Sequence, residues 1–94
     1  MRALTIAEDG YVSNLTRVVT AVVLTEDVPT ASAKRLRAAV RAVRLYAEAG
    51  ERALADGVLT QITEAAADLP VEVATVVVKH AERLRRQWNF EPRL

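Results

Sequence analysis

The chain has 94 residues, a formal net charge of +1 and no cysteine. This length supplies one modest hydrophobic core, so we expect a single domain over residues 1–94. The absence of cysteine excludes disulfides and thiolate chemistry, and the small net charge excludes a strong overall attraction to nucleic acid or anionic membranes. No apolar run approaches the roughly 18 residues that a membrane span requires, so we expect no membrane partner. The lack of cysteine fits a reducing compartment, and we expect a cytoplasmic protein.

The apolar residues of the chain are mostly small. There are 17 alanines and 14 valines but only four aromatic side chains. Small side chains bury little area, and burial contributes only about 25 cal/mol per Å². We therefore expect a thin core that self-association or a protein partner would stabilise further. The ratio of 11 arginines to 2 lysines is common in GC-rich genomes and their phages, so a phage origin is one hypothesis.

The pattern of apolar residues predicts an all-α, compact bundle of about four helices with short terminal tails. The first helix is expected over residues 11–25, with Asp9 as its N-cap and residues 1–8 as a tail or a short extended piece. Its apolar residues follow the i, i+3, i+4, i+7 spacing and are Leu15, Val18, Val19, Val22 and Val23.

The second predicted helix is the longest, over residues 31–56. Pro29 interrupts the chain before it, and Gly57 is expected to end it. Gly50 then lies inside the helix, where glycine either permits close packing or costs about 1 kcal/mol relative to alanine. The expected core face consists of Leu36, Val40, Val43, Ala47 and Leu54.

Two further helices are expected over residues 58–69 and 70–88, and residues 89–94 are expected to form a tail. The third helix carries one apolar side, made of Leu59, Ile62, Ala66 and Leu69. The fourth is strongly amphipathic, and its apolar face consists of Val73, Val77, Ala81, Leu84 and Trp88. Short connections favour antiparallel neighbours in such a bundle.

No group of residues indicates catalysis. His80 is the single histidine, which argues against a metal site, and there is no glycine-rich phosphate loop. Glu48 lies four residues from both Arg44 and Arg52, the spacing of an ion-pair ladder along one helix. We therefore predict a protein that is not an enzyme, with no metal, no cofactor and no small-molecule substrate.

A basic stripe lies opposite the core face of the second predicted helix. Its residues share one side of the helix at 100° per residue and are Lys34, Arg37, Arg41 and Arg44. Cations near the first turn oppose the helix dipole, so helix stability does not explain them. A solvated face is the preferred interpretation, and a surface for phosphates or an acidic partner is the alternative.

A second candidate surface lies near the end of the chain, where arginines and aromatic residues occur together. It consists of Arg85, Arg86, Trp88 and Phe90. Aromatic and arginine side chains are enriched in interface hot spots. The spacing of Trp88 from Ala81 and Leu84 also places it in the core, so Phe90 is the better candidate for a partner contact.

Residues 60–79 resemble the helix-turn-helix of DNA-binding proteins, since Thr60 and Gln61 open the segment and Ala65 is small. The segment departs from that family at the turn, where Leu69 replaces the usual glycine. Apolar and acidic residues also occupy positions where base-reading side chains are needed, namely Glu72, Val73, Val76 and Val77.

Two functions remain open from the sequence. The favoured one is a small non-catalytic protein that acts through protein–protein interaction and self-associates. The alternative is a small DNA-binding regulator that uses the basic stripe of the second helix, with or without residues 60–79.

Overall fold

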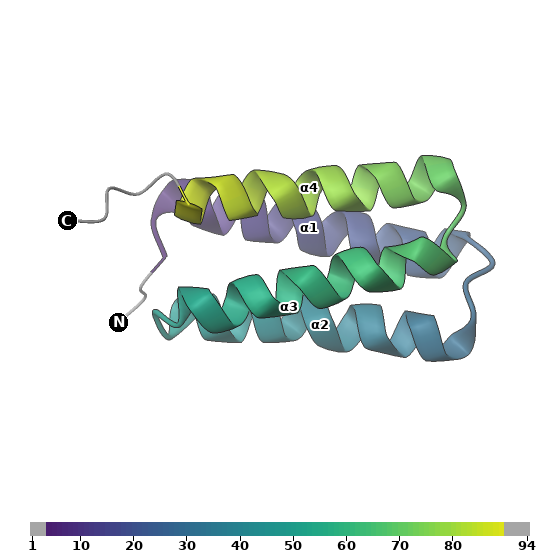
Figure 1. Ribbon diagram of the computed structural model, residues 1–94, viewed down its shortest axis with the longest axis horizontal. Coiled ribbons are helices and arrows are strands. Elements are labelled where there is room, and N and C mark those ends of the chain that lie inside the picture. The colour runs from purple at the N-terminus through teal and green to yellow at the C-terminus, as the bar shows by residue number, and fades with distance from the viewer. Residues whose placement is uncertain (1–3, 90–94) are drawn as a thin grey trace.

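A computed structural model describes residues 4–89 of the chain (Figure 1). The prediction of an all-α bundle of four helices is confirmed. The helices and one short 3₁₀ turn are, in chain order, α1 (Ile6–Thr25), α2 (Thr30–Glu48), α3 (Arg52–Ala65), η1 (Ala66–Asp68) and α4 (Val71–Asn89).

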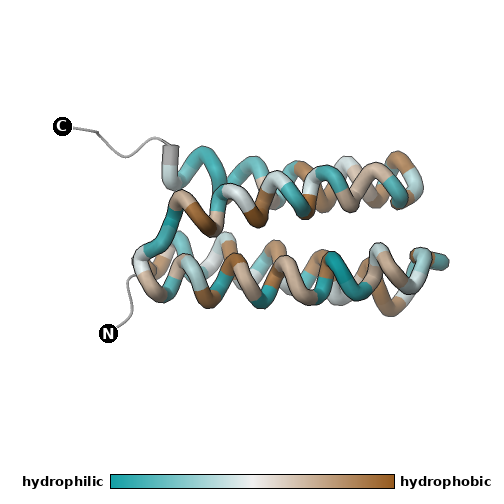
Figure 2. The backbone as a smooth tube through the Cα atoms, turned by 60° about the horizontal axis from the view of Figure 1, so that its bottom comes forward, coloured by the Kyte–Doolittle hydropathy of each residue, from teal (hydrophilic) through white to brown (hydrophobic). Residues whose placement is uncertain are grey.

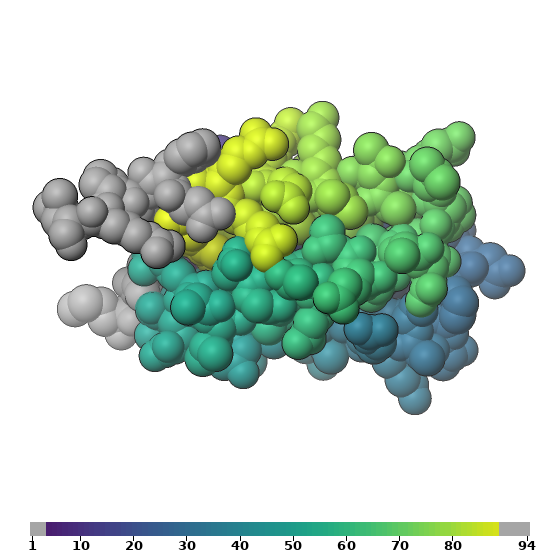
Figure 3. Space-filling view, in the orientation of Figure 1, coloured from purple at the N-terminus to yellow at the C-terminus, as the bar shows by residue number. Residues whose placement is uncertain are grey.

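Consecutive helices run antiparallel, with α1 and α4 in one layer and α2 and α3 in the other (Figure 1). Each helix packs against its two neighbours around the bundle, and side chains of α3 and α4 meet along the front of the molecule (Figure 3). The start of α1, the α2–α3 turn and the end of α4 therefore lie at the same end.

The core is formed by the apolar stripes of all four helices. Apolar and polar residues alternate along each helix with helical periodicity (Figure 2). Most of the apolar residues predicted for the first and fourth helices are buried, namely Leu15, Val19, Val22, Val77, Ala81, Leu84 and Trp88. The other three, Val18, Val23 and Val73, are partly buried against the core. Small side chains dominate the core, as the composition predicts.

The first helix begins earlier than predicted. α1 starts at Ile6, and the hydroxyl of Thr5, not Asp9, caps it by accepting a hydrogen bond of 3.1 Å from the backbone N–H of Glu8. Thr5 and Glu8 have the Thr-x-x-Glu spacing that is typical of a helix start. The interpretation of residues 1–8 as a tail is therefore wrong for residues 6–8, which form the first turn.

The long second helix predicted over residues 31–56 is wrong, because the chain reverses at Gly50. Gly50 has a φ of 80°, which favours glycine. Its N–H donates to the carbonyl of Ala47, and the N–H of Glu51 donates to that of Tyr46, as in a Schellman motif. Leu54 lies seven residues after Ala47, so periodicity alone continues the helix across the turn, yet its side chain is exposed rather than in the core.

Gly57 does not end a helix as predicted, since it lies inside α3. The third helix therefore starts at Arg52 rather than residue 58, and residues 66–68 form η1 instead of its last turn. Its predicted apolar residues are nevertheless all buried, namely Leu59, Ile62, Ala66 and Leu69. The fourth helix lies within one residue of its predicted bounds.

Candidate interaction surface

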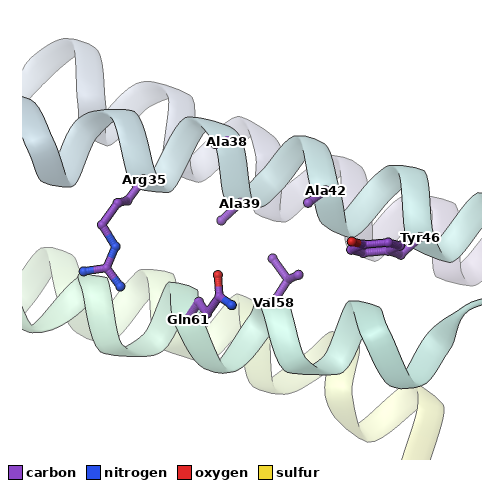
Figure 4. A pocket seen from close by; sticks show the side chains of 7 residues that line it. All are labelled: Arg35, Ala38, Ala39, Ala42, Tyr46, Val58 and Gln61. Atoms are coloured by element: carbon purple, nitrogen blue, oxygen red, sulfur yellow. The ribbon is translucent and has the colours of Figure 1, made fainter.

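A groove of about 340 Å³ lies between α2 and α3 on the outside of the bundle (Figure 4). We call it the α2–α3 groove, and its lining residues are Arg35, Ala38, Ala39, Ala42, Tyr46, Val58 and Gln61. The alanines form a row with Arg35 at one end and Tyr46 at the other. Because alanine projects only a methyl group, the backbone of α2 is open here to close approach by another helix.

Exposed apolar side chains border the groove at the end near the α2–α3 turn. Tyr46, which lines the groove, is 38% exposed. Leu54, on the first turn of α3, is 52% exposed. An isolated exposed leucine is ordinary on a protein surface, but two large apolar residues beside one groove mark a place where a partner can bury area.

Opposite charges lie at the two ends of the groove. The guanidinium of Arg35 extends toward α3 at the end opposite Tyr46 (Figure 4). Glu51 is exposed in the α2–α3 turn, at the Tyr46 end. Within residues 4–89 neither Arg35 nor Glu51 forms an ion pair, so both charges are available to a partner.

The predicted basic stripe is divided by the structure. Lys34, Arg37 and Arg41 are exposed on the outside of α2. Arg44 instead donates to Asp9 of α1 at 2.8 Å and to the Ser13 hydroxyl at 2.9 Å. Three of the four cations therefore face solvent, and the fourth joins two helices of the bundle.

The predicted C-terminal cluster is also divided. Trp88 is buried in the core, as its helical spacing indicates, and Arg85 donates to Asp56 of α3 at 2.8 Å and to Thr60. Arg86 is exposed and lines a cleft beside Tyr11. Phe90 lies outside the described residues. The described members therefore do not form one exposed surface.

A buried ionic cluster, which the sequence interpretation missed, joins α1, α3 and α4. Glu8 is only 1% exposed, and Arg52 binds both of its carboxylate oxygens, at 2.9 and 3.1 Å. The indole N–H of Trp88 donates to the same carboxylate at 2.8 Å. The turn at Gly50 places Arg52 at the head of α3, so the predicted ladder along one helix with Glu48 is wrong. Among sequence signals, only the Thr5-x-x-Glu8 spacing pointed to a helical Glu8.

The surroundings of Glu8, Arg85 and His80 shift the pKa of each group. Burial by itself raises the pKa of Glu8, but hydrogen bonds from Arg52 and Trp88 outweigh it, and the pKa lies below its ordinary value of 4.5. The hydrogen bond to Asp56 raises the pKa of Arg85. Burial lowers the pKa of His80, and the nearby Arg83 and Lys79 lower it further. These directions keep Glu8 and Arg85 charged at neutral pH.

Residues 60–79 span the end of α3, η1 and the first half of α4. The two helices lie side by side and antiparallel in Figure 1. Helix-turn-helix motifs instead cross at about 90–120°. Val73 is half-buried and Val77 fully buried, so this stretch of α4 directs an apolar face into the bundle.

The described residues offer neither a metal-ligand cluster nor a membrane-spanning helix. Among residues 4–89, no group of three or more histidine or acidic side chains is placed to hold a metal ion. None of the described helices is both long and apolar enough to cross a membrane. Comparisons with protein-family models, curated proteins and solved structures find no match to this chain.

Proposed function

We propose that this protein is a non-catalytic helical module that acts through protein–protein interaction and self-associates, with the α2–α3 groove as its contact surface. The observation that carries this proposal is the row of alanines bordered by exposed Tyr46 and Leu54. An apolar helix face of this kind suits a helical partner, because helix-in-groove recognition buries such rows.

The polar side chains give further support to an interaction role. The buried carboxylate of Glu8 and the half-buried Arg44, Arg52 and Arg85 are bound to groups on other helices. These contacts hold the bundle together, so these four charged groups are not the ones that a partner would bind.

Light scattering after size-exclusion chromatography tests the proposal. We expect the mass to rise above the 10.3 kDa of one chain as the concentration increases from about 1 µM to about 1 mM. Ala38→Glu places a charge in the groove at an exposed position and should keep the protein at the mass of one chain.

Ala21→Glu is the matched control, because Ala21 is an exposed residue of α1 on a different helix. It should associate like the wild type. A wild-type protein that stays at one chain throughout, or an Ala38→Glu variant that associates normally, would overturn the proposal.

A second candidate function, binding to DNA, is favoured by one observation. Lys34, Arg37 and Arg41 are exposed along α2 and, within residues 4–89, form no ion pair. Phosphate contacts by such residues make affinity fall steeply with salt. Titration of duplex DNA at about 50 and about 200 mM salt tests this function. The absence of binding at the lower salt concentration would reject it.

A further inference from the structure

The residues that α2 contributes to the α2–α3 groove are spaced symmetrically about Ala42. Ala38 and Tyr46 lie four residues before and after Ala42 on the same row of α2. We propose that the α2–α3 face of a second copy of this chain covers the groove, related by a two-fold axis that lies in the plane between the two faces, perpendicular to α2, and passes over Ala42. This inference rests on the proposed function and specifies its partner and its geometry.

The steric fit follows from that axis. The two α2 helices run antiparallel across it, so Ala42 meets the partner's Ala42 with only methyl groups between the backbones. Tyr46 then lies over the partner's Ala38, a large aromatic ring against a small residue. The contact is isologous, so each copy contributes the same residues and the assembly closes at two chains.

The charges complement each other under the same operation. Arg35 lies seven residues before Ala42, about 10 Å along the helix. The rotation brings Arg35 to the level of the end of the partner's α2, next to the partner's Glu51. Neither residue has an ion pair within the described chain. The dimer therefore forms the Arg35–Glu51 pair twice.

This charge pattern favours a second copy over a nucleic acid in the groove. One cation and one exposed carboxylate lie at its ends, with mostly apolar side chains between them. A phosphate backbone would meet a single favourable charge there, whereas a second copy satisfies both charges and covers the apolar row.

Charge reversal with measurement of the dimer dissociation constant tests this geometry. Arg35→Glu or Glu51→Arg alone places like charges opposite each other in both symmetric pairs, and each should raise Kd at least about tenfold. The double variant Arg35→Glu/Glu51→Arg restores opposite charges, and its Kd should return to within about threefold of the wild type. Arg17→Glu, a matched reversal at an exposed position of α1, should leave Kd unchanged.

The outcomes separate this inference from the proposed function. A protein that dimerises and is blocked by Ala38→Glu, but whose double variant shows no recovery, overturns the two-fold arrangement while leaving the groove as the contact surface. Open-ended oligomers also overturn it. Absence of any self-association overturns both. Thermal unfolding of each variant, expected within a few degrees of the wild type, establishes that changes in Kd come from the interface.

Discussion

The arginines that point between helices bind carboxylates, whereas the arginines on the outside of α2 bind none within the part of the chain that the structure describes. The inward set consists of Arg44, Arg52 and Arg85, and each member binds a carboxylate of another helix at 2.8 or 2.9 Å. The outward set consists of Arg35, Arg37 and Arg41. Within residues 4–89 its members form no ion pair.

The difference indicates that arginine serves two purposes in this small bundle. Apolar contacts between alanines and valines are weakly directional, so they define the position of one helix against another only loosely. The planar guanidinium of an inward arginine fits a carboxylate in one orientation and can fix that position. An outward arginine binds no carboxylate within residues 4–89, so its charge remains available to a partner.

The largest expected effect comes from Arg52→Met, which leaves the buried Glu8 carboxylate without its cation. We expect the free energy of unfolding to fall by about 3 kcal/mol, since breaking a buried pair from one side is costly. The outward control, Arg41→Met, should change it by less than about 0.5 kcal/mol. Urea denaturation measures both. Equal losses of unfolding free energy in Arg52→Met and Arg41→Met would contradict the distinction between inward and outward arginines.

Gly50→Ala should have the next largest effect, because the reversal at Gly50 is what brings Arg52 to Glu8. The φ of 80° is unfavourable for alanine, and we expect a loss of about 1–2 kcal/mol. Gly57→Ala is the control, since a Cβ at Gly57 meets nothing within 4 Å and should stabilise α3 by about 0.5–1 kcal/mol. If both variants lost stability, or both gained it, the assignment of the turn to Gly50 would be contradicted.

Arg44→Gln should produce a smaller loss, about 0.5 kcal/mol, because the Arg44–Asp9 pair is partly exposed. Chemical denaturation at low and high salt should show this loss shrinking as salt screens the wild-type pair. A loss as large as that of Arg52→Met would mean that burial does not govern the strength of these inward contacts.

The pH dependence of Glu8 should be the smallest effect, because burial opposes the hydrogen bonds that lower its pKa. A lowered carboxyl pKa stabilises the fold above the ordinary value of 4.5 and loses this contribution as the pH falls through the folded value. The unfolding free energy of Glu8→Gln should therefore decline less steeply than that of the wild type below pH 4.5. Parallel curves would show that Glu8 has no such role.

The sequence predicts the core better than the ends of the helices. Leu15, Val19 and Leu84 are buried as their periodicity indicates, because that signal repeats with every turn. The α2–α3 reversal was missed because Leu54 falls in phase with Ala47 across it. Gly50 was the available signal, but its φ depends on tertiary structure.

The sequence gives less information about the candidate surfaces. Glu8 is 44 residues from Arg52 and 80 from Trp88, and no local pattern brings such residues together. The α2–α3 groove requires α3 to fold back on α2, whereas periodicity predicts one continuous helix. Lys34, Arg37 and Arg41 were predictable as an exposed stripe because they lie on one helix.

Amide chemical shifts followed by two-dimensional NMR over a dilution series test the central claim most directly. Self-association through the α2–α3 groove predicts concentration-dependent shifts at Arg35, Ala38, Ala42, Tyr46 and Glu51, with the outer face of α4 unchanged. Shifts centred on α4, or spectra that do not change with concentration, would contradict the account.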